Sequence, residues 1–79
     1  MYLIAIDEEF GTVAAPQGMA DITGEAVDLF HFFGLRWNDE KGMFATPVAD
    51  EIEGISLAVT LLVNLEILGH DVAGIALKG

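Results

Sequence analysis

Carboxylates are the chemically capable side chains that stand closest together in this sequence. Six of the thirteen fall into two short groups: Asp7, Glu8 and Glu9, and then Asp50, Glu51 and Glu53. Paired carboxylates act as general acid and base only where burial or neighbouring charges separate their pKa values. Both groups fall where a loop or a first helical turn is expected, in contact with water. We therefore expect them to bind rather than to catalyse.

The other residues that catalysis requires are scarce. Cysteine is absent, and the only serine, Ser56, lies inside an apolar stretch with no histidine or acid spaced as a triad would need. The nine glycines are dispersed and form neither a dinucleotide-binding nor a phosphate-binding loop. The sequence therefore predicts a protein that is not an enzyme and uses no cofactor.

Metal binding has two weak candidates. Asp28 and His31 stand three residues apart and could share a cation, but His31 falls opposite the apolar stripe of its predicted helix. Asp7, Glu8 and Glu9 could hold calcium, but they lack the spacing of an EF-hand loop. We expect no metal site.

Net charge is the strongest clue to the kind of partner. Thirteen acids stand against three bases, a formal charge of −10 on 79 residues. Such a chain lacks the clustered Lys and Arg that bind nucleic acid or an anionic membrane. Its attractive partner is a basic protein surface, above all the nucleic-acid-binding groove of another protein. Plain solubility, or adaptation to high salt, explains the same composition.

Hydrophobic periodicity predicts seven elements in one domain spanning residues 1–79. Strands are expected at Tyr2–Ile6 and Thr12–Ala15, joined as a hairpin through the first acid group. The helix that follows has an apolar stripe, starts with Asp21 or Thr23 as cap and closes at Gly34; the stripe comprises Ile22, Ala26, Leu29, Phe30 and Phe33.

The second half of the chain repeats this order. A second hairpin is expected from Leu35–Trp37 and Met43–Ala45. A helix begins at Thr46-Pro47, and a last strand covers Val72–Leu77. The order β-β-α-β-β-α-β predicts an α+β two-layer sandwich, with a small mixed or antiparallel sheet and two helices on one face.

Chain direction in this fold brings the two acid groups together. The first hairpin tip and the start of the second helix fall at one end, which gathers six carboxylates there. The second hairpin tip, with Asp39 and Glu40, is expected at the opposite end, near Asp21 and Asp71.

Exposed apolar residues are the second class of candidate contact. Phe32 lies about 100° from the stripe of the first helix and is either a flank of the core, which we favour, or an exposed anchor. Trp37 and Phe44 are expected to pair across the second hairpin, half-buried, or to form a contact patch if they face away from the helices. The second helix is apolar on nearly every side, so part of it must meet the first helix or a second copy of the chain.

These observations favour a non-enzymatic inhibitor that presents carboxylates where a partner expects phosphates. The predicted partner-binding residues are Asp7, Glu8, Glu9, Asp50, Glu51, Glu53, Trp37 and Phe32. In size and charge alone the chain resembles small acidic proteins that phages encode against host defence, including anti-CRISPR and anti-restriction proteins. The alternative is a homo-oligomeric structural or adaptor domain that uses the apolar second helix as its interface. A cation-regulated module is a third, weaker hypothesis.

Targeting signals are not evident. No basic segment precedes an apolar run at the start of the chain, and the longest uncharged stretch, residues 54–65, is shorter than the roughly 20 residues that span a membrane. We expect a cytoplasmic protein that does not contact membranes.

Overall fold

The computed structural model describes residues 1–78 and confirms the predicted α+β class. It contains five strands, two α-helices and one short 3₁₀ helix. In chain order these are β1 (Tyr2–Asp7), β2 (Gly11–Pro16), η1 (Met19–Ile22), α1 (Glu25–Phe32), β3 (Arg36–Asn38), β4 (Met43–Thr46), α2 (Glu51–Ile67) and β5 (Val72–Lys78).

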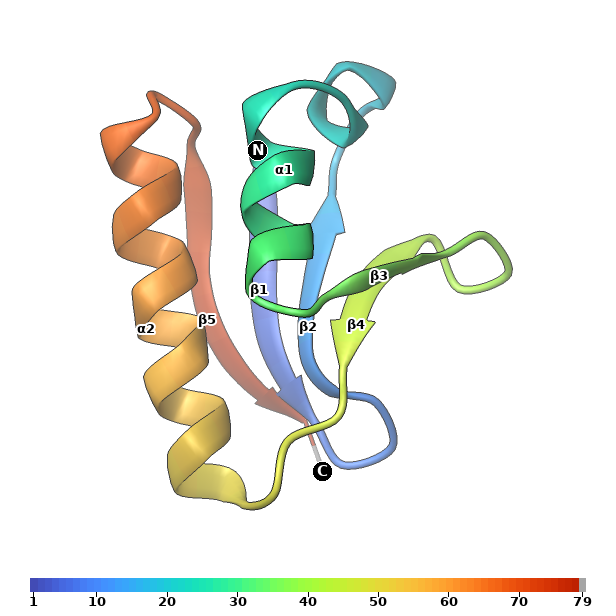
Figure 1. The fold of residues 1–79 in the computed structure, drawn as a ribbon, viewed down its shortest axis with the longest axis vertical. Helices are drawn as coiled ribbons and strands as arrows, with labels where there is room; N and C mark the ends of the chain where they lie inside the picture. Colours follow the sequence, from blue (N-terminus) through green and yellow to red (C-terminus); the bar gives the residue numbers. More distant parts are fainter. Residues whose placement is uncertain (79) are drawn as a thin grey trace.

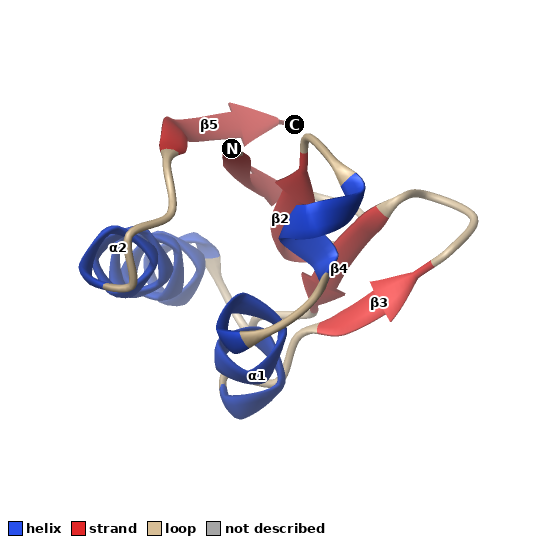
Figure 2. Ribbon diagram, turned by 90° about the horizontal axis from the view of Figure 1, so that it is seen from above, coloured by secondary structure: helices blue, strands red, loops and turns tan. Residues whose placement is uncertain are grey.

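The sheet is mixed and has the strand order β3-β4-β2-β1-β5. Neighbouring strands are antiparallel except for β1 and β5, which run parallel and pair the start of the chain with its last described residues. Both α-helices cover the same face of this sheet, as Figures 1 and 2 show. The molecule is therefore a two-layer sandwich, as predicted.

Side-chain alternation along the strands builds the core between sheet and helices. Tyr2, Ile4 and Ile6 of β1 point to the helical layer and are buried against residues such as Phe30 of α1 and Leu61 of α2. The ring of Phe30 meets that of Tyr2 edge-on, with centroids 5.3 Å apart. This cluster joins both helices to the centre of the sheet.

The start of α2 differs from the prediction. Thr46 does not cap a helix: it is the last residue of β4, opposite Thr12 of β2. The helix begins at Glu51 after Asp50, whose carboxylate accepts a hydrogen bond of 2.7 Å from the backbone N–H of Glu53. Cross-strand pairing therefore extends β4 through the predicted cap, and an acidic residue takes over capping.

The start of α1 also differs. Neither Asp21 nor Thr23 caps it, and Gly24 precedes its first residue with a positive φ of 78°. The Asp21 carboxylate instead lies 2.8 Å from the amino group of Met1, and the Thr23 hydroxyl donates to the carbonyl oxygen of Ala20. The end of the helix is as predicted, because Gly34 adopts a φ of 87°.

Candidate protein-binding site

Two acidic segments lie at the same end of the molecule. The β1–β2 turn and the first turn of α2 lie at the lower end in Figure 1, because β1 runs toward this end and α2 starts from it. We call this surface the acid end. Its members are Asp7, Glu8, Glu9, Asp50, Glu51 and Glu53. These six residues therefore lie at one end, as expected from chain direction in the predicted fold.

Three carboxylates of the acid end are held by backbone N–H groups. Asp7 accepts hydrogen bonds from the N–H groups of Glu9, at 2.8 Å, and Phe10, at 3.3 Å, which shapes the β1–β2 turn. Asp50 caps α2, and Glu53 reaches back to the N–H of Ala49 at 3.1 Å. These groups are fixed in place by the same bonds that define the turn and the helix start.

The other three carboxylates are solvated. Glu8, Glu9 and Glu51 are exposed, and within residues 1–78 their side chains make no hydrogen bond. They contribute charge without holding the local backbone. Only Glu8, Glu9 and Glu51 can therefore be neutralised without removing a hydrogen bond that holds the turn or the helix start.

The β3–β4 turn was predicted to lie at the end opposite the acid end. This prediction was wrong, because the turn lies to one side of the molecule (Figure 1). The Nζ of Lys41 in this turn is 5.7 Å from the ring centroid of Phe10, beside the β1–β2 turn. Twisting of the two outer strands away from the sheet axis accounts for this position. A cation therefore borders the acid end.

The two aromatic residues predicted as partner contacts have different surroundings. Phe32 is 82% exposed, so its favoured assignment to the core was wrong. The core-facing positions of the short helix α1 are filled by Ala26 and Phe30, which leaves Phe32 on the solvent side. Trp37 instead packs half-buried against Phe44, with ring centroids 4.9 Å apart, on the helical side of the sheet. It does not join the acid end.

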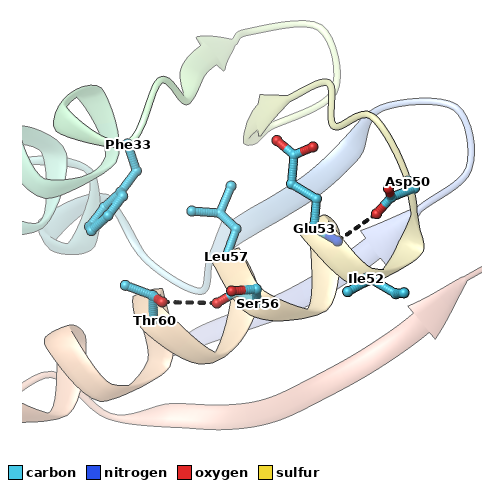
Figure 3. A pocket seen from close by; sticks show the side chains of 7 residues that line it. All are labelled: Phe33, Asp50, Ile52, Glu53, Ser56, Leu57 and Thr60. Atoms are coloured by element: carbon cyan, nitrogen blue, oxygen red, sulfur yellow. Dashed lines mark hydrogen bonds between the residues drawn. The ribbon is translucent and has the colours of Figure 1, made fainter.

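A groove runs along α2 next to the acid end (Figure 3). It has a volume of about 570 Å³ and opens to solvent. Its lining comes from the end of α1 and the first half of α2: Phe33, Asp50, Ile52, Glu53, Ser56, Leu57 and Thr60. The groove was not predicted from the sequence, since the local residue pattern does not determine how far apart two helices will lie.

The solvent side of α2 is apolar. Five exposed residues spaced three or four apart form one stripe, namely Ile52, Ile55, Val59, Val63 and Ile67. Opposite them, Gly54, Ala58, Leu61 and Leu65 are buried against the sheet. We call the five exposed residues the α2 stripe. Its spacing was visible in the sequence, but only the structure shows that no other element among residues 1–78 covers it.

Comparisons with known proteins identify no relative. No protein-family model, curated protein or solved structure matches this chain. The function must therefore be inferred from the geometry of the surfaces themselves.

Within residues 1–78 no three His, Asp or Glu side chains come together as a metal site would require. Neither α-helix there is long and apolar enough to cross a lipid bilayer. The acid end, the groove and the α2 stripe are the surfaces with distinctive charge or exposed apolar side chains.

Proposed function

We propose that this domain is a non-enzymatic inhibitor that binds the basic nucleic-acid-binding surface of another protein through its acid end. One observation carries the proposal: six carboxylates from two segments far apart in sequence lie at one end of the molecule. In this mode they take the place of phosphates in the partner's groove. Duplex DNA carries one charge per roughly 1.7 Å, so the footprint corresponds to a few base pairs.

Pre-ordering supports this mode of binding. Asp7, Asp50 and Glu53 are held by backbone hydrogen bonds before any partner arrives, so little side-chain freedom is lost on association. Exposed charge of this kind accelerates encounter with a basic surface and weakens as salt screens it. The proposed inhibitor would act in the cytoplasm on a nucleic-acid-binding enzyme, in the manner of phage anti-CRISPR or anti-restriction proteins.

A matched pair of triple variants tests the proposal. Glu8→Gln, Glu9→Gln and Glu51→Gln neutralise the solvated half of the acid end. The control neutralises three exposed acids elsewhere: Glu25→Gln, Glu66→Gln and Asp71→Asn. Both variants lose the same charge, so a difference between them reports position rather than total charge.

The binding experiment uses proteins enriched from bacterial lysate on heparin-agarose, captured on the immobilised chain. We expect wild type and control to retain proteins that rising salt or added duplex DNA releases, and the acid-end variant to lose them. Equal retention by both variants would overturn the proposal. So would capture that detergent reverses but DNA does not.

A homo-oligomer is the second candidate, and the α2 stripe is the observation that favours it. Ile52 and Ile67, at its two ends, are 80% and 76% exposed, and contiguous apolar surface of this kind commonly marks a protein interface. An antiparallel pairing of two α2 helices would keep the two acid ends apart. Light scattering after size exclusion should then give a dimer mass that Val59→Lys reduces to the monomer and Gln17→Lys does not. A monomeric wild type removes this candidate.

A further inference from the structure

We infer that the groove between α1 and α2 receives the apolar face of a basic amphipathic helix belonging to the partner. The inference rests on the proposed function, because it gives the basic partner of the acid end a second, apolar contact. It also adds what charge alone lacks, namely a means of choosing among basic surfaces.

The shape of the groove fits a helix. Asp50, Glu53, Leu57 and Thr60 line it at intervals of three or four residues, so they share one face of α2. Ten residues of helix rise about 15 Å, which is nearly three turns of a partner helix lying alongside. The ring of Phe33 at the end of α1 forms the opposite wall (Figure 3).

The chemistry of the lining changes along its length. Asp50 and Glu53, which also belong to the acid end, place carboxylates at one end of the groove, while Leu57 and Phe33 provide an apolar surface further along. The Thr60 hydroxyl is already engaged, because it donates to the Ser56 carbonyl oxygen at 2.9 Å. The groove therefore offers negative charge at one end and hydrocarbon in the middle.

Charge complementarity selects the occupant. None of the seven lining residues is basic, so an acidic segment would be repelled, and a purely apolar one would leave the two carboxylates without a cation. A helix with apolar residues on one face and Lys or Arg one turn away satisfies both parts of the groove. Phe32 is not part of the lining, but its exposed ring meets Phe33 edge-on, with centroids 5.2 Å apart.

The test uses a synthetic Leu-Lys-Ala peptide of about 18 residues, long enough to form a helix once bound, with its leucines on one face. A scrambled peptide of the same composition has the same charge but no apolar face. Each is titrated into the isotope-labelled chain at about 0.02 M and about 0.5 M salt. We expect amide shifts at Ser56, Leu57 and Thr60. Burial of one leucine should give the amphipathic peptide about 10-fold tighter binding than the scrambled one.

Variants separate the groove from the acid end. Ser56→Trp fills the groove from an exposed helix position and should weaken the amphipathic peptide about 10-fold, whereas Gln17→Trp, on an exposed loop, should not. Circular dichroism of both variants verifies that they remain folded. The Glu8, Glu9 and Glu51 triple variant should weaken both peptides, since its effect is on charge.

The two proposals fail in different ways. Equal binding of the two peptides, unchanged by Ser56→Trp, overturns the groove inference and leaves the acid end to be judged by the DNA-competition experiment. The groove inference is also overturned if neither peptide binds. Selective binding that survives the acid-end triple variant supports the groove and counts against polyanion mimicry.

Discussion

The hydroxyl of Thr12 donates a hydrogen bond of 3.3 Å to the carbonyl oxygen of Gly54. Thr12 is fully buried in β2, and Gly54 lies in the first turn of α2. The approach is close, because a Cβ on Gly54 would lie 3.2 Å from Cγ2 of Ile6. This contact fixes the start of α2 against the sheet and so keeps the two halves of the acid end together.

Thr12→Val should lower the free energy of unfolding by about 1 kcal/mol, because it removes a buried hydrogen bond while keeping the side-chain shape. Thr60→Val is the control, since the Thr60 hydroxyl also donates to a backbone carbonyl but in a half-exposed position. Water can bond to the Ser56 carbonyl oxygen instead, so Thr60→Val should lower the free energy of unfolding by less than about 0.5 kcal/mol. Urea unfolding measures both, and equal effects would deny the Thr12 bond its structural role.

Gly11→Ala should be far more damaging than Gly69→Ala, although both glycines have nearly the same positive φ, 84° and 87°. A Cβ on Gly11 would overlap the Thr46 carbonyl oxygen and lie 2.9 Å from Cα of Pro47, whereas one on Gly69 meets nothing within 4 Å. We expect a loss of about 1 kcal/mol at Gly69 from backbone strain alone. At Gly11 the clash should raise the loss to about 3 kcal/mol or more. Similar midpoints in urea for the two variants would contradict this.

Tyr2 should make the fold sensitive to alkali. Burial, reinforced by the negative charge of Asp21, raises the pKa of Tyr2 to about 12. In the unfolded chain the pKa is about 10, so between these values the unfolded state loses a proton that the folded state retains. Stability should therefore be intact below about pH 10 and fall as the pH rises toward 12.

Tyr2→Phe provides the comparison. The Tyr2 hydroxyl is buried and has no hydrogen-bond partner in the described structure, so its removal should raise the free energy of unfolding by about 1 kcal/mol near neutral pH. The sequence has a single tyrosine, so the alkaline loss should also shrink in this variant. Unfolding curves from about pH 8 to about pH 12 measure both effects. If the free energy of unfolding fell more steeply with rising pH in Tyr2→Phe than in the wild type, Tyr2 ionisation would not be its cause.

Asp50→Ala should cost about 1 kcal/mol, because α2 loses its N-cap. Asp50→Asn retains an oxygen that can accept from the Glu53 N–H, so it should cost less even though it removes the same charge. The difference separates capping from electrostatics. Thermal unfolding followed at a helix-sensitive wavelength measures it, and a larger loss for Asn than for Ala would contradict the capping role.

Local patterns in the sequence were sufficient to predict most elements and the gathering of acids. The two hairpins follow from apolar runs around polar turns, and the end of α1 follows from Gly34. The start of α2 was misplaced because Thr46-Pro47 is a good local cap signal, yet Thr46 gains more from pairing with Thr12 across the sheet. Such pairing depends on a strand more than thirty residues away, so the residues next to Thr46 do not indicate it.

Tertiary packing accounts for the other differences. Phe32 is exposed because Phe30 already fills the space under α1. A helical wheel gives the direction of a side chain but not the number of aromatic rings that a core of this size can hold. The groove was invisible for a similar reason, since it exists only through the spacing of α1 and α2. Trp37 was predicted to pair with Phe44, and it does so, although this pairing turns it away from the acid end.

The parallel pairing of β1 with β5 sets Tyr2 opposite Val72. β1 is synthesised before every other element described and β5 after them, so β1 cannot complete its pairing until the intervening elements have been made. Until then β1 exposes an unpaired edge on which other chains could add. Contacts so distant in sequence slow the search for the native state, and this small domain should fold more slowly than a helical bundle of equal length.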